Sequence, residues 1–141
     1  KTNSLENTYI KSRTEGFGDE VKRRIMLGTF VLSAGYHQEY FTKAQQIRRL
    51  IKEKTEEIFL DYDFLISPTT MHTAFDIGKK HTDPTVMYLE DIFTVQANLT
   101  GNPAISLPAG THSNGLPIGL HVMGENFKEA ELLQFSKHML N

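Results

Sequence analysis

Residues 103–124, PAISLPAGTHSNGLPIGLHVMG, decide the fold class. Two short apolar runs, 103–108 and 117–124, flank a Ser113-Asn114-Gly115 segment of the kind that closes a turn between strands. In the second run apolar residues alternate with others along the chain, as in a strand with one buried face. The sequence therefore predicts two strands joined by a turn.

A helix is predicted directly before these strands. The Asp83-Pro84 pair is typical of a helix start, with an N-cap aspartate followed by proline at the first helical position. The helix is expected to run to Thr100 and to end at Gly101.

Further elements alternate along the rest of the chain. Apolar periodicity predicts helices at 18–34, at 36–60 and from about 127 onward, and a buried strand at 63–67. Residues 68–83 resemble a loop, and the polar residues 1–16 are predicted to form an extended lead-in. Alternating helices and strands indicate an α/β layer arrangement.

Length and composition narrow the class of protein. The 141 residues suit one globular unit, and we predict a single unit over 1–141. The 15 basic and 17 acidic side chains are spread along the chain, which argues against a nucleic-acid-binding arm. Without cysteine there is no thiol nucleophile, disulfide or Cys-ligated zinc. No apolar run is long enough for a membrane span, so we expect a cytoplasmic protein, and its start at Lys1 suggests a piece of a longer chain.

Metal and RNA sites are not predicted. His72 and His81 lie in one loop without a partner motif, which is typical of solvated histidines. The basic residues of 48–54 are diluted by glutamates up to residue 57, which favours a solvated helix face with i, i+4 ion pairs. No hydrolase or kinase motif supplies a recognisable nucleophile.

One arginine falls on the apolar arc of the helix predicted at 18–34. At about 100° per residue, Arg24 lies among Val21, Ile25, Gly28, Val31 and Leu32. A buried unpaired charge costs several kcal/mol, so this arginine needs a partner. Glu20, one turn earlier, is the partner that periodicity favours. The alternative is an external carboxylate bound by two parallel hydrogen bonds.

The helix predicted before Gly101 carries a narrow polar stripe. Its members are Glu90, Asp91, Thr94 and Asn98. The stripe is either the solvent edge of a packed helix, which is the commoner case, or the lining of a polar cleft with Asp91 facing a cationic group.

Four ordered segments resemble the amidase signature family. They are SRTEGFGDEVKRRIMLGTFVLSAGYHQEYFTKAQQIRRLI, DYDFLISPTTMHTAF, DPTVMYLEDIFTVQANLTGNPAISLPAG and NGLPIGLHVMG. The resemblance is to the C-terminal part of the tRNA-dependent amidotransferase branch and covers about Ser12 to Glu131. It implies the C-terminal portion of an α/β/α fold, with a mixed β-sheet flanked by helices.

The resemblance also implies a glutamine site. The family hydrolyses amides with a lysine and two serines in an upstream Gly/Ser-rich segment, which this sequence lacks, so no catalytic residue is implied here. In the glutamine-using members an arginine binds the α-carboxylate of glutamine and an aspartate binds its α-ammonium. The matching positions are Arg24 and Asp91, which reverses the preference drawn from periodicity.

Partners follow from the same resemblance. Ammonia would pass to other subunits, which use ATP and Mg²⁺ on misacylated Glu-tRNA or Asp-tRNA, with no cofactor held by this chain. Two alternatives stay open: a hydrolase of a simple amide without a tRNA partner, and an inert scaffold fragment. Because a fragment of a larger sheet exposes strand edges and apolar surface, we also expect self-association.

Overall fold

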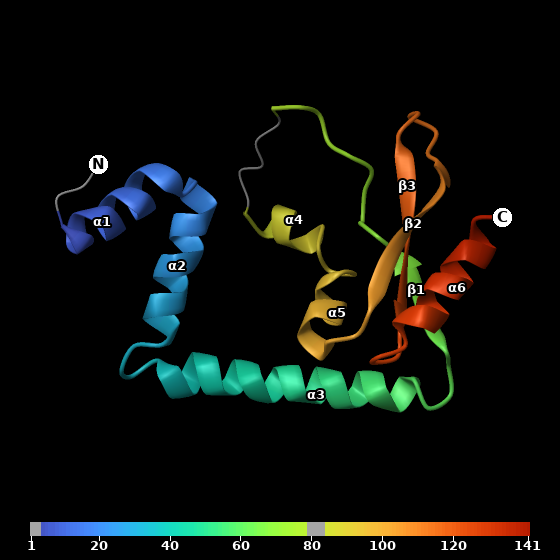
Figure 1. The fold of residues 1–141 in the computed structure, drawn as a ribbon, viewed down its shortest axis with the longest axis horizontal. Helices are drawn as coiled ribbons and strands as arrows, with labels where there is room; N and C mark the ends of the chain where they lie inside the picture. Colours follow the sequence, from blue (N-terminus) through green and yellow to red (C-terminus); the bar gives the residue numbers. More distant parts are fainter. Residues whose placement is uncertain (1–3, 79–83) are drawn as a thin grey trace. The chain divides into compact units, whose positions relative to one another are not determined.

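The computed structural model describes residues 4–78 and 84–141. In chain order its elements are α1 (Leu5–Gly16), α2 (Asp19–Val31), the π-helix η1 (His37–Thr42), α3 (Lys43–Ile58), β1 (Phe64–Pro68), α4 (Pro84–Leu89), α5 (Val95–Thr100), β2 (Ala104–Thr111), β3 (Pro117–Gly124) and α6 (Glu129–Met139) (Figure 1). The chain divides into two compact units, Lys1–Ile47 (unit 1) and Arg48–Asn141 (unit 2). The α/β class is confirmed, whereas a single folding unit stays a prediction.

The extended lead-in predicted for residues 1–16 is wrong, because α1 forms there. Ser4 caps the helix, its hydroxyl accepting a hydrogen bond from the Asn7 amide at 3.2 Å. Glu6 in the first turn and Arg13 in the last turn have the charges that the helix dipole favours. The segment lacks the apolar periodicity from which a helix with one buried face is predicted, and in the structure no residue of α1 is buried.

The two helices predicted after this segment form with changes at their ends. α2 starts after Gly18 with Asp19 and Glu20 in its first turn, as predicted. Gly35 follows with φ +94°, in the left-handed region that glycine favours. The helix predicted at 36–60 begins as η1, whose hydrogen bonds skip one residue more than those of an α-helix, and continues as α3.

The sheet has the strand order β1-β3-β2, and both pairs are antiparallel. On the central strand, His121 lies opposite Ser67 of β1 and Ser106 of β2. The predicted strands are thus confirmed, while the mixed sheet stays an expectation for the larger fold. A buried strand at 63–67 is wrong in part: β1 is an edge strand of the described sheet, and its Ile66 is exposed.

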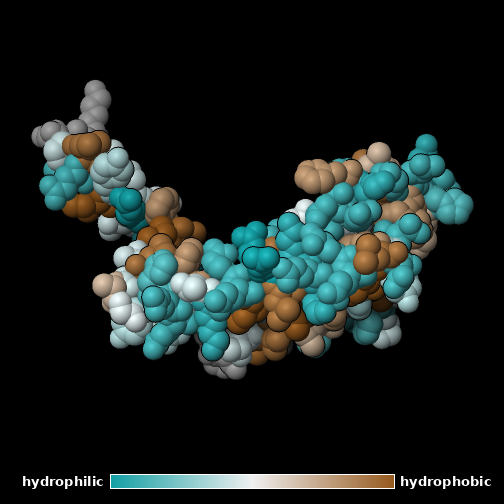
Figure 2. All heavy atoms as spheres, turned by 90° about the horizontal axis from the view of Figure 1, so that it is seen from below, coloured by the Kyte–Doolittle hydropathy of each residue, from teal (hydrophilic) through white to brown (hydrophobic). Residues whose placement is uncertain are grey.

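The core lies between the sheet and α6, which packs against β3 and β2. Val122 at its centre is 0% exposed. Around it pack Leu107, Leu132, Phe64, Ile105, Leu120 and Phe135. The rings of Phe64 and Phe135 stack with centroids 4.4 Å apart. By contrast, many apolar side chains elsewhere are exposed, as the brown atoms among the teal surface in Figure 2 show.

Two hydroxyl groups meet over Gly119 of β3. Thr69 Oγ1 and Ser106 Oγ are 2.6 Å apart, and the Thr69 amide donates to Gly119 O at 3.0 Å. A Cβ added to Gly119 would lie 2.6 Å from the threonine oxygen and 2.9 Å from the serine oxygen. The first residue after β1 is therefore tied to both other strands.

The single helix predicted up to Thr100 is wrong, because a turn interrupts the helix between α4 and α5. The Asp91 amide donates to Tyr88 O at 3.2 Å, and the Thr94 and Val95 amides donate to Asp91 O at 3.0 and 2.9 Å. The Thr94 hydroxyl also donates to Asp91 O at 3.2 Å, a side-chain bond that competes with regular helix geometry. Apolar periodicity continues through this turn and hides it in the sequence.

The ends of this helical segment agree better with expectation. α4 begins at Pro84, and its predicted N-cap, Asp83, lies outside the described residues. α5 ends at Gly101, whose φ of +85° is the left-handed cap conformation that was predicted.

Within unit 2, α5 is joined to α3 by side chains. Gln96 Nε2 donates to Thr55 Oγ1 at 2.9 Å. Arg48 Nε donates to Leu99 O at 2.7 Å, which satisfies one of the last carbonyls of α5. The i, i+4 ion pairs predicted along 48–57 also form, and Lys54 makes a further pair with Glu57 at i, i+3.

Candidate substrate-binding site

Arg24 lies on α2 in unit 1, with its side chain 66% exposed. Its Nε donates to Glu20 Oε1 at 3.0 Å, and Arg23 Nη1 donates to Oε2 of the same glutamate at 2.7 Å. The structure therefore shows the partner that periodicity favoured. Val21 and Ile25 of the predicted apolar arc are exposed as well, so this arc is not buried in unit 1.

Asp91 lies in unit 2, in the turn between α4 and α5, and is exposed. Its backbone is fixed by the bonds from Thr94 and Val95 to its carbonyl. Its carboxylate has no hydrogen-bond or ion-pair partner among residues 4–78 and 84–141. A carboxylate on a fixed backbone, without a side-chain partner, is available to a cationic ligand.

Glu90, the neighbour of Asp91, is less exposed and has a side-chain partner. Its side chain is 21% exposed, and His72 Nδ1 lies 2.9 Å from Glu90 Oε1. Because an ionised carboxylate only accepts hydrogen bonds, the imidazole N–H donates. The predicted polar stripe is thus divided between one paired and one open carboxylate.

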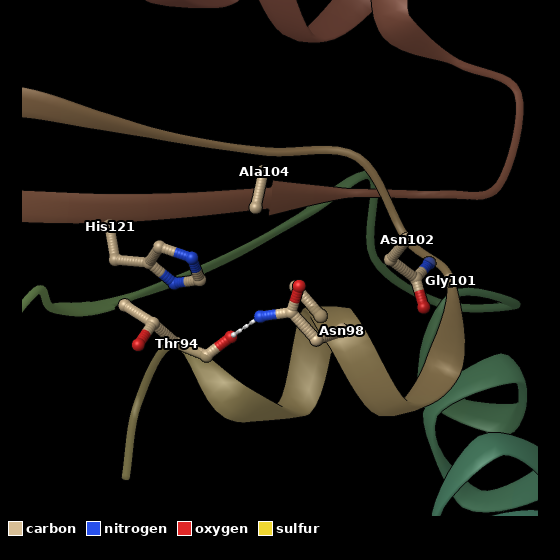
Figure 3. Close-up of a pocket in the computed structure, with 7 residues that line it drawn as sticks. Thr94, Asn98, Gly101, Asn102, Ala104 and His121 are labelled. Carbon is tan, nitrogen blue, oxygen red and sulfur yellow. Dashed lines mark hydrogen bonds between the residues drawn. The ribbon is translucent and has the colours of Figure 1, made fainter. Parts of the chain in front are cut away.

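A pocket of about 470 Å³ lies beside α5, where the other half of the stripe meets the sheet (Figure 3). Thr94 and Asn98 line it together with Asn102 and with His121 of β3. Asn98 Nδ2 donates to Thr94 O at 3.1 Å, shown by the dashed line. Asn102 Nδ2 donates to Gly124 O at 2.8 Å. For Thr94 and Asn98 the cleft interpretation of the stripe is therefore correct.

His121 is the residue of this pocket that the sequence did not reveal. It is buried, and burial lowers the pKa of its imidazole, so the ring is neutral at pH 7. It alternates with Leu120 and Val122 and therefore faces the opposite side of β3. A polar residue between apolar ones in a central strand was the available signal.

The two residues implied as glutamine ligands belong to different units. Arg24 is in unit 1 and Asp91 in unit 2, so their joint use stays a prediction. Of the two loop histidines, His72 pairs with a glutamate and His81 lies outside the described residues. Over the described part of the chain, no three His, Asp or Glu side chains are grouped so as to hold a metal ion.

Comparison with known proteins identifies the family. A family model described as Amidase matches residues 1–133. The chain belongs to the amidase family. An amidase-family relative from Halothermothrix orenii, named as the A subunit of Glutamyl-tRNA(Gln) amidotransferase, is 57% identical over 131 residues, which are 93% of this chain and 27% of that protein. The protein of the same name from Latilactobacillus sakei is 56% identical over 126 residues, covering 89% and 26%.

Solved structures agree with the amidase-family assignment. The crystal structure of the A subunit of Glutamyl-tRNA(Gln) amidotransferase from Thermotoga maritima matches with a TM-score of 0.63 and 50% identity, over 85% of this chain and 26% of that one. The structure of 6-aminohexanoate cyclic dimer hydrolase matches with a TM-score of 0.59 and 28% identity, over 72% and 24%. A crystal structure of an amidase, 20% identical with a TM-score of 0.70 over 93% and 30%, supports the fold alone.

This amidase-family chain spans about a quarter of the length of these relatives, 27% for the Halothermothrix protein. Among the helices of the described residues, none combines the length and the apolar character needed to cross a bilayer.

Proposed function

We propose that this chain is part of the glutamine-hydrolysing subunit of a tRNA-dependent amidotransferase. The observation that carries the proposal is its 57% identity over 131 residues to the A subunit of such an enzyme. Hydrolysis of a simple amide is the second candidate, because a cyclic-amide hydrolase is 28% identical over 72% of the chain. The higher identity favours the amidotransferase.

In the proposed function this segment holds glutamine. The Arg24 guanidinium binds the α-carboxylate of glutamine with two parallel hydrogen bonds, and the Asp91 carboxylate binds its α-ammonium. The contact of Arg24 with Glu20 does not prevent this, because an exposed i, i+4 pair is worth only about 0.3–0.5 kcal/mol. Binding both charged groups on the α-carbon orients the substrate, which contributes to lowering the barrier at the amide.

The nucleophile and the tRNA chemistry lie outside this segment in our proposal. The sequence has no Gly/Ser-rich segment to supply the serine relay, so the isolated 141 residues are expected to be inactive. Other subunits receive the ammonia, and they bind ATP, Mg²⁺ and the tRNA charged with Glu or Asp. Incubating the purified chain with glutamine and measuring ammonia tests the inactivity directly.

A chimera tests the glutamine site. The matching 131-residue segment of the Halothermothrix orenii protein is replaced by that of this chain, and ammonia release from glutamine is measured in the assembled amidotransferase. Asp91→Asn should lower kcat/KM for glutamine about 10- to 150-fold, the loss of one charge-assisted hydrogen bond. Arg24→Gln should act in the same direction.

The matched control is Asp61→Asn, which alters another exposed aspartate of unit 2 and should leave turnover unchanged. Near-normal kcat/KM for the Asp91 variant would contradict the assignment. Faster hydrolysis of a simple aliphatic amide than of glutamine, insensitive to Asp91, would establish the second candidate instead.

We also propose that the isolated chain self-associates. β1 and β2 each have one unpaired edge in the described sheet, and many apolar side chains of both units are exposed. A monomer in size-exclusion chromatography with light scattering at high concentration would contradict this.

A further inference from the structure

We infer that His72 and Glu90 form a positioning pair for Asp91. The pair ties the turn that carries Asp91 to the loop after β1, and it keeps the neighbouring carboxylate away from the substrate ammonium. The inference rests on the proposed function, since only there does Asp91 bind an ammonium group.

The loop on the His72 side is anchored to the sheet at two places. Before His72, the Thr69 amide donates to Gly119 O at 3.0 Å, and the Thr69 hydroxyl contacts Ser106 Oγ at 2.6 Å. After it, Thr73 Oγ1 accepts a hydrogen bond from Asn114 Nδ2 at 2.9 Å. His72 therefore projects from a segment that is held on both sides.

After Asp91, the turn on the Glu90 side leads into α5. There α5 is tied to α3 through Gln96 and Thr55 at 2.9 Å. Before it stands α4, a helix of six residues. The 2.9 Å contact of His72 with Glu90 adds a tie directly before Asp91 and completes a path from the sheet to that residue.

Charge gives the pair a second role. Glu90 and Asp91 are adjacent carboxylates, and an ammonium group is attracted to both of them. The imidazole N–H occupies Glu90, whose side chain is 21% exposed, whereas Asp91 is exposed and without a side-chain partner in the described chain. The pair thereby leaves Asp91 as the carboxylate that meets the substrate.

The test uses the chimeric amidotransferase and a pair of ligands. L-Glutamine has an α-ammonium, and glutaramate is the same molecule without it. His72→Ala should raise KM for glutamine about two- to fivefold, a modest change because His72 is 70% exposed, and should leave kcat and the Ki of glutaramate unchanged.

Three further variants separate positioning from general stability. His72→Asn keeps an N–H donor and should restore KM. Glu90→Ala should match His72→Ala, and the double variant should be no worse than either single one, because both remove the same contact. His138→Ala, which alters an exposed histidine of α6, is the control that should change nothing.

The outcomes distinguish this inference from the proposed function. If Asp91→Asn raises KM for glutamine but His72→Ala and Glu90→Ala do not, the positioning role is overturned and the proposed function stands. Equal changes for glutamine and glutaramate, or a KM for His72→Asn as high as that for His72→Ala, also overturn it. If Asp91→Asn has no effect, the proposed function falls and the inference falls with it. Should His72→Ala not fold, Glu90→Ala decides by the same criteria.

Discussion

Unit 1 and unit 2 are stabilised in different ways. Among residues 4–47 none is buried, whereas unit 2 contains the core around Val122. In unit 1, Lys22 Nζ reaches back to Thr14 O, eight residues earlier. In unit 2, Gln96 reaches Thr55 across 41 residues. Unit 2 therefore has a core of its own, while the helices of unit 1 depend mainly on caps and contacts within a few residues.

The largest loss of stability is expected when a leucine of the unit 2 core is truncated, compared with a leucine of unit 1. Leu132→Ala removes a buried side chain of the core and should lower the free energy of unfolding by about 2–5 kcal/mol. Leu27→Ala on α2 removes a side chain that is 59% exposed and should cost less than about 0.5 kcal/mol. Urea denaturation followed by circular dichroism measures both, and equal losses of stability would contradict this difference between the units.

A smaller effect is expected from removing one threonine hydroxyl in each unit. Thr55→Val deprives the Gln96 amide of its acceptor in the interior of unit 2 and should cost about 1–3 kcal/mol. Thr29→Val removes a bond that the hydroxyl donates to Ile25 O at 2.9 Å, on an exposed helix face of unit 1, and should cost less than about 0.5 kcal/mol. Urea denaturation of the two variants would contradict the comparison if their costs were the same.

Removing a helix cap should act within unit 1 alone. Ser4→Ala deletes the acceptor for the Asn7 amide and should weaken α1 by about 0.5–2 kcal/mol, at the lower end for so exposed a helix. Amide hydrogen exchange should therefore become faster in α1 and stay unchanged in β3. Faster exchange throughout the sheet would show that the two units are stabilised together.

The smallest effect concerns pH and the buried histidine of unit 2. Burial lowers the pKa of His121 below its ordinary value, so the unfolded chain binds a proton at a higher pH than the folded chain. The contribution of the neutral His121 to the free energy of unfolding is fully present above the unfolded-state pKa of about 6.5. It is lost as the pH falls towards the folded-state value. His121→Gln should flatten the fall in unfolding free energy between pH 7 and 5, whereas His37→Gln in unit 1 should not. An unchanged slope for His121→Gln would exclude this cause.

Local signals predicted much of the fold, and what was missed depends on hydrogen bonds that apolar periodicity does not report. The turn at 113–115 and the cap at Gly101 depend on residues that the sequence displays side by side. The break at Asp91 is made by hydrogen bonds within four residues, which apolar periodicity does not report, and the pairing of His72 with Glu90 joins two separate segments. For the site, sequence placed Asp91 on a polar stripe, but the open state of its carboxylate required the structure.

Gly119 has a consequence for how this segment tolerates variation. Its backbone has an ordinary negative φ, so the need for glycine comes from the space above it, which the hydroxyls of Thr69 and Ser106 fill. In a saturation mutagenesis library even alanine should be depleted at this position. Further changes that remove both hydroxyl groups should restore it, so position 119 would be epistatic with positions 69 and 106.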